Sequence, residues 1–380
     1  MIPAFSIVSN GKDFSNIYRQ RIVSLKITDD ASEHTDSLEV ELADPDGLVP
    51  IPLKGEMLDV GMGYAGQLTP MGHFIISEPS IDGPPDVVKF TGKAAPFIAT
   101  QSMKPFQSRK SRSFDMVTIG DLVAKIAQET GLTPAVDPSL ASITITHIDQ
   151  TAESSMNLLT RLARSYNALM KPKAGHLCFV QRGQAISANG SDVGGITIDR
   201  TMCSKYGMKI DQRENFDKVR TRSHDIASGN TFLSETTKNG TVTTALTPQN
   251  DTEESSDDDS NDSGNDAIYE HPHDYPDQET AEAASKSIYN RATMASQTVQ
   301  VTILGNAKFV AGGMMNLVGF KKSIMNQAWW ISKIEHEYTK AGFITVISGM
   351  LPATTSKVGS SEPSTGSQEY ASGAGFAADH

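Results

Sequence analysis

The chain has 380 residues and a formal net charge of −12, with 33 Lys and Arg against 45 Asp and Glu. This acidity argues against a nucleic-acid binder that neutralises phosphates through a basic face, and no run of about eighteen apolar residues is present to span a membrane. Two cysteines, Cys178 and Cys203, are too few for a disulfide framework or a thiolate metal cage. The N-terminus lacks the basic segment and apolar core of a secretory signal, which predicts a protein made and folded in the cytoplasm.

Residues 1–104 alternate between apolar and polar positions, as half-buried strands do. Leu38, Val40 and Leu42 point to one face, while the residues between them point to the other. Turn residues follow at 44–47, where the sequence reads Asp-Pro-Asp-Gly. Further strands are expected at Met57–Met62, His73–Ser77 and Val87–Thr91. This region is therefore predicted to be an antiparallel β domain.

Residues 105–200 change to a helical period. Thr118 as N-cap and Gly131 as C-terminal stop enclose a stripe of apolar residues, and a second helix is expected to begin after Ser154. A hairpin should follow, with strands at Ala168–Lys171 and His176–Gln181. The middle of the chain is therefore predicted to be a small α+β domain.

Residues 201–350 return to strands, with one helix at about 277–294. They are interrupted at about 247–268 by an acidic segment, in which Asp251–Asp266 carries eight acidic residues and no basic one. Such a stretch has too little apolar surface to offset its ordering entropy, so we expect a disordered loop with both ends in one domain. The Ser-, Thr- and Gly-rich residues 351–380 are expected to form a flexible tail.

Two stretches of the chain resemble each other. The first comprises 38–42, 55–61, 74–77 and 87–92, and the second comprises 299–303, 313–319, 330–332 and 344–349. In both, two glycines lie six residues apart around a Met and a Val (Gly55 and Gly61, Gly313 and Gly319). Any two antiparallel units can share such features; the alternative is a duplicated β-barrel, one copy near each end. Three chains could then build a ring of six near-equivalent barrels, since such assemblies usually have closed rotational symmetry.

Several runs of this sequence are similar to characteristic runs of the phage late control gene D family. The most specific are Ser139–Gln150 and Glu153–Ala163 in the middle domain. Further similar segments occur in the same order at Leu42–Gly47, Pro85–Val88, Val318–Lys321 and Trp330–Ile334. The resemblance covers roughly residues 30 to 350.

Members of that family are baseplate hub proteins of contractile-tailed phages and resemble the N-terminal part of type VI secretion spike proteins. The resemblance implies an α+β, mainly β fold, with two tail-tube-like antiparallel β-barrel domains (1–104 and 201–350) around the α+β domain (105–200). It implies a homotrimer in the virion tail baseplate, assembled in the host cytoplasm, that joins the hexameric tail tube or tube-initiator protein to a trimeric membrane-piercing spike. Other implied partners are further baseplate proteins and the tape measure protein; DNA would only pass through the lumen, and no stable membrane association is expected.

Three polar clusters could carry chemistry. His271-Pro272-His273-Asp274 resembles a metal site, but its spacing matches no closed zinc pattern, so a solvated linker is favoured. The carboxylates of residues 253–259 could bind calcium weakly, but they lack the Gly and Glu of an EF-hand loop. The basic run 108–112 (Ser-Arg-Lys-Ser-Arg) could touch phosphate, although a surface loop joining two domains is favoured.

No catalytic, cofactor-binding or metal-binding residue is predicted, because the sequence has no nucleophile elbow and no catalytic cysteine signature. Trp329 and Trp330 are expected in a core or interface, and Cys178 is expected to be a buried free thiol. The sequence therefore predicts a structural hub protein that is not an enzyme. The alternatives are a tail-tip peptidoglycan hydrolase and a type VI secretion spike-like protein, which normally continues into further domains.

Overall fold

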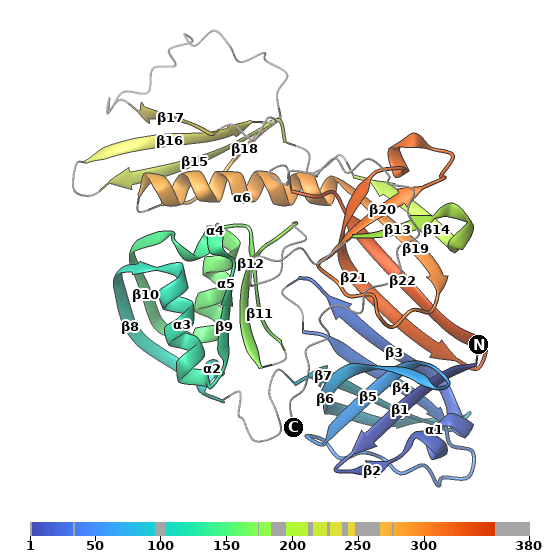
Figure 1. Ribbon diagram of the computed structural model, residues 1–380. Coiled ribbons are helices and arrows are strands. Elements are labelled where there is room, and N and C mark those ends of the chain that lie inside the picture. Colours follow the sequence, from blue (N-terminus) through green and yellow to red (C-terminus); the bar gives the residue numbers. More distant parts are fainter. Residues whose placement is uncertain are drawn as a thin grey trace.

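The chain folds into two β modules, a small α+β module between them, and an inserted sheet that packs on a long helix (Figure 1). The computed structural model describes residues 2–32, 35–95, 104–173, 175–183, 195–211, 216–225, 229–237, 242–247, 267–275 and 277–353. No helix in these ranges is both long enough and apolar enough to cross a membrane.

The N-terminal module (residues 2–95) is built from antiparallel strands and one short helix. Its elements are β1 (Pro3–Ser9), β2 (Lys12–Asp13), α1 (Ser15–Arg21), β3 (Ile22–Asp30), β4 (Ser37–Ala43), β5 (Met57–Tyr64), β6 (Gln67–Asp82) and β7 (Val87–Ala94). The alternation in β4 buries Leu38, Val40 and Leu42 together with Phe74 and Phe90. Burying each such side chain contributes roughly 1.5–3 kcal/mol relative to exposing it.

The middle module (residues 104–183) packs helices against two small sheets. Its elements are α2 (Lys104–Gln107), β8 (Arg109–Thr118), α3 (Ile119–Thr130), β9 (Thr133–Val136), α4 (Pro138–Ala141), β10 (Thr144–Ser154), α5 (Ser155–Ser165), β11 (Ala168–Lys173) and β12 (His176–Gln181). The expected caps are confirmed: the Thr118 and Ser154 side chains accept hydrogen bonds from the N–H groups of Asp121 and Asn157. Gly131 ends α3 with a φ of +73°, a conformation that glycine adopts without steric cost.

The C-terminal module (residues 195–211 and 297–353) is a second set of strands. Its elements are β13 (Gly195–Asp199), the 3₁₀ helix η1 (Arg200–Met202), β14 (Cys203–Ile210), β19 (Gln297–Leu304), β20 (Met314–Val318), η2 (Ser323–Met325), β21 (Ala328–Thr339) and β22 (Gly342–Met350). Strand β13 pairs with β20. Residues 195–199 therefore pair with this module, although the sequence analysis grouped them with the middle domain.

An inserted unit interrupts the C-terminal module between β14 and β19. It consists of β15 (Lys218–Asp225), β16 (Asn230–Thr237), β17 (Val242–Thr247), β18 (Ile268–Glu270) and the helix α6 (Gln278–Ser296). In Figure 1, α6 lies between this sheet and the middle module. Strands β17 and β18, which flank the acidic segment, belong to the same sheet. The acidic residues 251–266 and most of the expected tail, 354–380, lie outside the described residues.

The two β modules share one strand order. It is β3-β4-β7-β6-β5-β1 in the N-terminal module and β14-β19-β22-β21-β20-β13 in the C-terminal module. Both modules have a β-bulge on the fourth strand of this order, at Ser77 in β6 and Ser332 in β21. Each of these serines donates a hydrogen bond to a carbonyl of the paired strand, Thr91 O or Ser348 O. The internal similarity therefore extends to topology and to a local irregularity.

A second shared bulge fixes the correspondence of the first strands. The register of β3 on β4 shifts at Val23, and that of β14 on β19 shifts at Ser204. Position 22 therefore corresponds to 203, and Leu25 to Tyr206. Because bulges are specific backbone features and not a product of apolar alternation, they favour a duplicated module over chance similarity.

The structure corrects the glycine alignment by one residue. Gly55 N–H donates to Ile76 O, and Gly312 N–H donates to Ile331 O. Both glycines have positive φ, +87° and +95°. Gly55 therefore corresponds to Gly312 and not to Gly313, because spacing between glycines does not determine which residues pair across the strands.

Mainly β structure with helices is confirmed, whereas two separate barrels are not. Among the described residues, strand pairing closes neither module on itself, and both modules belong to one thirteen-stranded sheet. The modules also differ at their last strand: β1 pairs antiparallel with β5, but β13 pairs parallel with β20. The expectation of purely antiparallel modules is therefore wrong at β13.

Candidate functional site

The most distinctive contact in the chain is the seam where the two β modules join. We define the seam as the antiparallel pairing of Ser24–Asp30 in β3 with Lys333–Thr339 in β21. These strands lie at opposite ends of the sequence, and Figure 1 shows them side by side where the blue and orange modules meet. Backbone pairing continues one sheet from module to module, so the seam fixes their relative orientation.

One face of the seam is charged. Lys26 Nζ lies 2.7 Å from Glu335 Oε1, and Lys333 Nζ lies 3.4 Å from the same oxygen. The hydrogen bond with Glu335 raises the pKa of Lys26. Burial opposes ionisation of Glu335, but Lys26 and Lys333 together lower its pKa. Because Lys26 is partly exposed, such a pair contributes at most about 1 kcal/mol and mainly specifies register.

The other face of the seam is apolar and enters the core of the N-terminal module. Tyr338 and Phe343 pack there, with ring centroids 5.0 Å from Phe5 and 5.8 Å from Tyr64 respectively. The Tyr64 hydroxyl donates to the Gly305 carbonyl at 2.9 Å. The hydrophobic core is therefore continuous across the seam.

A histidine is fully buried within the seam. His336 lies opposite Ile27, and its ring nitrogens lie 3.0 Å from Thr345 Oγ1 and 3.3 Å from Phe309 O. Burial lowers the pKa of His336, although the Phe309 carbonyl and Asp29 act in the opposite direction. The folded chain therefore holds this imidazole neutral.

This neutral histidine should make the chain less stable in mild acid. Below the unfolded-state pKa of about 6.5, the unfolded chain binds a proton that folded His336 does not, so stability falls by up to about 1.4 kcal/mol per pH unit. We expect His336→Gln to flatten the dependence of the urea midpoint on pH between about 6.5 and 5. Measurements at pH 8 give each variant's baseline, and an unchanged slope in the variant would contradict the assignment.

A buried charge cluster joins all three modules beside the seam. Lys171 of β11 donates to Asp30 O at 2.6 Å and forms an ion pair with Asp36. Lys173 Nζ lies 3.0 Å from Asp29 Oδ1, while Asp29 Oδ2 accepts from the N–H of Ala311 in the C-terminal module. We call Asp29, Asp36, Lys171 and Lys173 the three-module cluster.

The electrostatics of this cluster favour the ionised forms of Asp29 and Lys173. Burial opposes ionisation of Asp29, but Lys173, the Ala311 N–H and Lys171 lower its pKa on balance. Burial likewise opposes the charge of Lys173, while Asp29 and Asp36 raise its pKa. The side chain of Lys173 is 48% exposed and that of Lys171 only 11%, so Lys171 carries most of the buried interaction. These ion pairs and hydrogen bonds therefore orient the middle module relative to the two β modules.

Sequence reasoning missed the three-module cluster and the seam. Lys171 lies among the apolar residues Leu169, Met170 and Leu177 of its hairpin. A lysine in so apolar a hairpin indicates a buried ion pair, and this was the one sign of the cluster in the sequence. Its partners lie far away in the sequence, so no local pattern could identify them.

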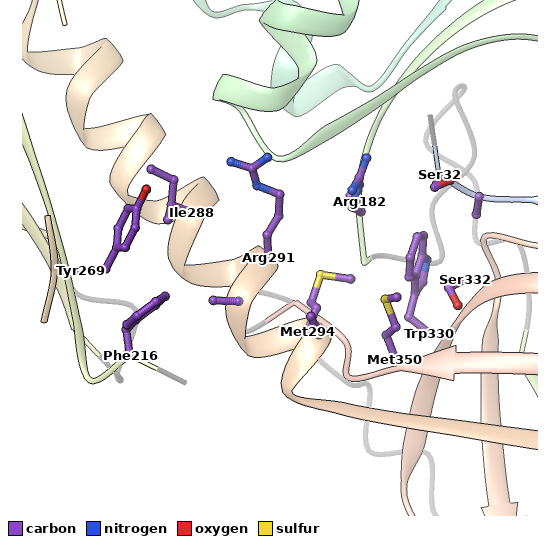
Figure 2. Close-up of a pocket in the computed structure, with 13 residues that line it drawn as sticks. Ser32, Arg182, Phe216, Tyr269, Ile288, Arg291, Met294, Trp330, Ser332 and Met350 are labelled. Atoms are coloured by element: carbon purple, nitrogen blue, oxygen red, sulfur yellow. The ribbon is translucent and has the colours of Figure 1, made fainter. Parts of the chain in front are cut away.

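Two clefts lie on α6, and the first reaches the end of the seam at Ala31 and Ser332. The first, of about 480 Å³, runs between α6 and the C-terminal module; Figure 2 shows Met294, Trp330 and Met350 on its wall and Arg182 and Arg291 beside it. Its described lining contains no Asp, Glu, His or Cys, and its titratable side chains are Tyr269, Arg182 and Arg291. The second, of about 670 Å³, lies between α5 and α6.

The residues singled out in the sequence do not converge. His271 contacts the rings of His273 and Tyr275 and borders the second cleft, while His273 and Asp274 are exposed. Within the described ranges, no group of three or more His, Cys, Asp or Glu is arranged to hold a metal ion. The carboxylates 253–259 lie outside those ranges.

The basic run at 108–112 corrects one expectation. It was expected to be a loop, but Arg109 begins strand β8, which pairs with β10. Lys110 and Arg112 lie on one face of that strand, and both form ion pairs with Glu129 of α3, at 2.6 and 2.5 Å. Two of the run's three basic side chains are therefore held by ion pairs within the middle module.

The remaining residues of interest are structural. Trp329 and Trp330 are buried as expected, and their indole nitrogens donate to Met325 O and Gly312 O. Cys203 is buried, whereas Cys178, expected to be buried, is only partly so; both are free. Burial raises the pKa of both thiols, which keeps them protonated.

Comparisons with known proteins point to one family. A family model described as phage tail baseplate hub (GPD) matches residues 106–342. A probable baseplate hub protein of Escherichia phage 186 is 29% identical over 362 residues, covering 91% of this chain and 92% of that protein. Another from Escherichia phage P2 is 33% identical over 220 residues, covering 58% of this chain and 56% of that protein.

A solved structure shares the fold. The 43 kDa tail protein of prophage MuSo2 from Shewanella oneidensis superposes with a TM-score of 0.65, covering 93% of this chain and 99% of that one. At 12% identity this likeness concerns the fold alone. The arrangement of modules seen in Figure 1 is therefore that of a known tail protein.

Proposed function

Because this chain belongs to the phage tail baseplate hub family, we propose that three copies form a ring that joins the hexameric tail tube to the trimeric spike. As a baseplate hub protein it is a structural component of the virion tail. The finer proposal concerns stoichiometry and neighbours: six β modules from three chains, with tube or tube-initiator protein on one side and spike on the other.

The observation that carries this proposal is the duplicated module. Each chain holds two modules with one strand order and two shared bulges, already joined through a continuous sheet at the seam. If modules of neighbouring chains were joined in a similar way, three chains would present six near-equivalent units around an axis. Closed rotational symmetry is the usual outcome of such repeating contacts.

The proposal assigns no catalytic role. Several charged residues form ion pairs between modules, as in the three-module cluster. No specific observation favours the peptidoglycan hydrolase. The β-barrels expected from the sequence become part of this proposal. Strand pairing between neighbouring chains would then close the sheet that remains open within one chain.

The mass of the purified chain in solution tests this proposal. Light scattering coupled to size exclusion should give three times the chain mass of 40.9 kDa, with dissociation on dilution. The same preparation should leave suspended cell walls turbid. A persistent monomer or dimer at every concentration would contradict the trimer, and clearing of the walls would contradict the non-enzymatic role.

A further inference from the structure

Each β module has a strand edge without a partner strand among the described residues. The second half of β6, Glu78–Asp82, pairs with β7 on one side only, and β14 pairs with β19 on one side only. Unpaired edges present a row of N–H and C=O groups that invite another strand. These two edges lie in different modules of the chain.

The duplication relates these open edges to the seam. Strand β6 corresponds to β21 through the bulges at Ser77 and Ser332, so Ile81 corresponds to His336. Strand β14 corresponds to β3 through the bulges at Ser204 and Val23, so Met208 corresponds to Ile27. The two strands that form the seam are therefore the counterparts of the two strands left open.

We propose that the open edge of β6 in one copy pairs with the open edge of β14 in the next copy, in the register of the seam. His336 lies opposite Ile27 in the seam, which sets Ile81 opposite Met208 between copies. By the same correspondence Ser80 lies opposite Lys209. This second seam rests on the proposed ring and specifies the surface that closes it.

One face of the second seam is apolar on both sides. On β6, Pro79 and Ile81 share the face of their buried partners Phe90 and Val88. On β14, Tyr206 and Met208 share the face of their buried partners Val301 and Val299, and Ile210 continues this face. Ile81, Tyr206 and Ile210 are 65%, 40% and 53% exposed, and pairing would remove them from water together.

The other face is acidic on β6 and mainly basic on β14. Glu78 and Asp82 project from β6, while Lys205 and Lys209 project from β14. The proposed register sets Asp82 opposite Gly207, diagonally between the two lysines, within reach of long side chains. The same register sets Glu78 opposite Asp211, a like-charge pair that weakens the second seam, with Lys209 diagonal to Glu78. A register shifted by one residue would set apolar against charged residues, so the alternation excludes odd shifts. Among the registers that keep the faces matched, the correspondence with the seam selects this one.

The second seam should be weaker than the first. The counterparts of Tyr338 and Phe343 are Gly83 and Asp86, so no aromatic pair crosses it. Pro79 has no N–H, which removes one donor from the ladder. Such an edge resists uncontrolled pairing yet accepts a matching strand, and assembly should therefore depend on concentration.

Engineered cysteines in the full-length chain test the register. Ser80 and Lys209 correspond to Glu335 and Thr28. The Ala31 N–H donates to Ser332 O, so Ala31 and Ser332 form a hydrogen-bonded pair. Hydrogen-bonded and non-hydrogen-bonded pairs alternate, so Thr28 and Glu335, three pairs further along, form a non-hydrogen-bonded pair. Such non-hydrogen-bonded pairs have Cα atoms about 4.5 Å apart, which suits a disulfide. Oxidation of the chain carrying both Ser80→Cys and Lys209→Cys should therefore give covalent trimers on a non-reducing gel.

Two matched variants calibrate the result. Thr28→Cys with Glu335→Cys should form a disulfide within one chain, and Ser80→Cys with Lys205→Cys, four residues out of register, should link far less. A trimer in solution without trimeric products at Ser80 and Lys209 would overturn the second seam and leave the proposed function standing. Products that extend beyond three chains would support the second seam and contradict the trimer. A monomer at every concentration, without cross-links, would overturn both.

Discussion

Replacing Lys171 with methionine is expected to lower the free energy of unfolding by about 3–5 kcal/mol, because breaking a buried ion pair leaves its partner charged and unpaired. Lys171 is 11% exposed at its side chain, forms an ion pair with Asp36 and donates to Asp30 O. Methionine has a similar length and keeps the packing of the stem. The midpoint of urea unfolding, followed by circular dichroism, measures the loss.

Lys173→Met is the matched control. It removes the same charge from the same strand and cluster, but its side chain is 48% exposed, so the expected loss is about 1 kcal/mol or less. Combining Lys171→Met with Asp36→Asn should recover part of the loss, because Asn can still accept the hydrogen bond from Asp30 N–H. Equal losses for Lys171→Met and Lys173→Met would show that burial of the cluster does not determine its strength.

Gly305→Ala is expected to lower stability by about 3 kcal/mol, at the upper end of the range for overpacking a core. A Cβ at this position would overlap the ring of Phe343, with even the Cδ2 atom only 2.6 Å away. That ring is fully buried between the modules, and the Gly305 backbone is held by Phe343 O and by the Tyr64 hydroxyl. Neither group can move without disturbing the seam.

Gly195→Ala serves as the control for this substitution. Gly195 also lies on a strand of the C-terminal module, but the nearest atoms to its added Cβ are 3.8 Å away, so stability should change by less than about 0.5 kcal/mol. Thermal unfolding of the two variants beside the parent measures both effects. Equal melting temperatures for Gly305→Ala and the parent would mean that the seam core can expand.

Local signals explain what could be predicted from the sequence. The helix that begins after Thr118 and ends at Gly131 was correct to the residue, because caps are satisfied by neighbours in the chain. Alternation identified β4, since period two shows which face is buried. The internal similarity of the two β modules was visible in the sequence, although the alignment of Gly55 with Gly313 was wrong by one residue.

Non-local contacts explain what could not be predicted. Alternation identifies the face of a strand and not the strand beside it, so the pairing of β3 with β21 was not foreseen. Lys171 and Asp36 are 135 positions apart, and neither shows its partner in its own neighbourhood. The sequence predicts a loop for the basic run at Lys110 and Arg112, because their ion-pair partner Glu129 belongs to another element.

The insertion between β14 and β19 distinguishes the two modules at one corner. The corresponding corner of the N-terminal module is the short connection between β3 and β4, whereas this corner carries the β15–β18 sheet and α6. In a ring of alternating modules, the bulky corner would recur at every second position. A sixfold-symmetric neighbour that contacts only the surfaces common to both modules would meet six equivalent surfaces. A threefold-symmetric neighbour could instead be oriented by contacts with the three insertions. One gene duplication followed by one insertion would thus suffice to let a single chain match a sixfold-symmetric partner on one side and a threefold-symmetric partner on the other.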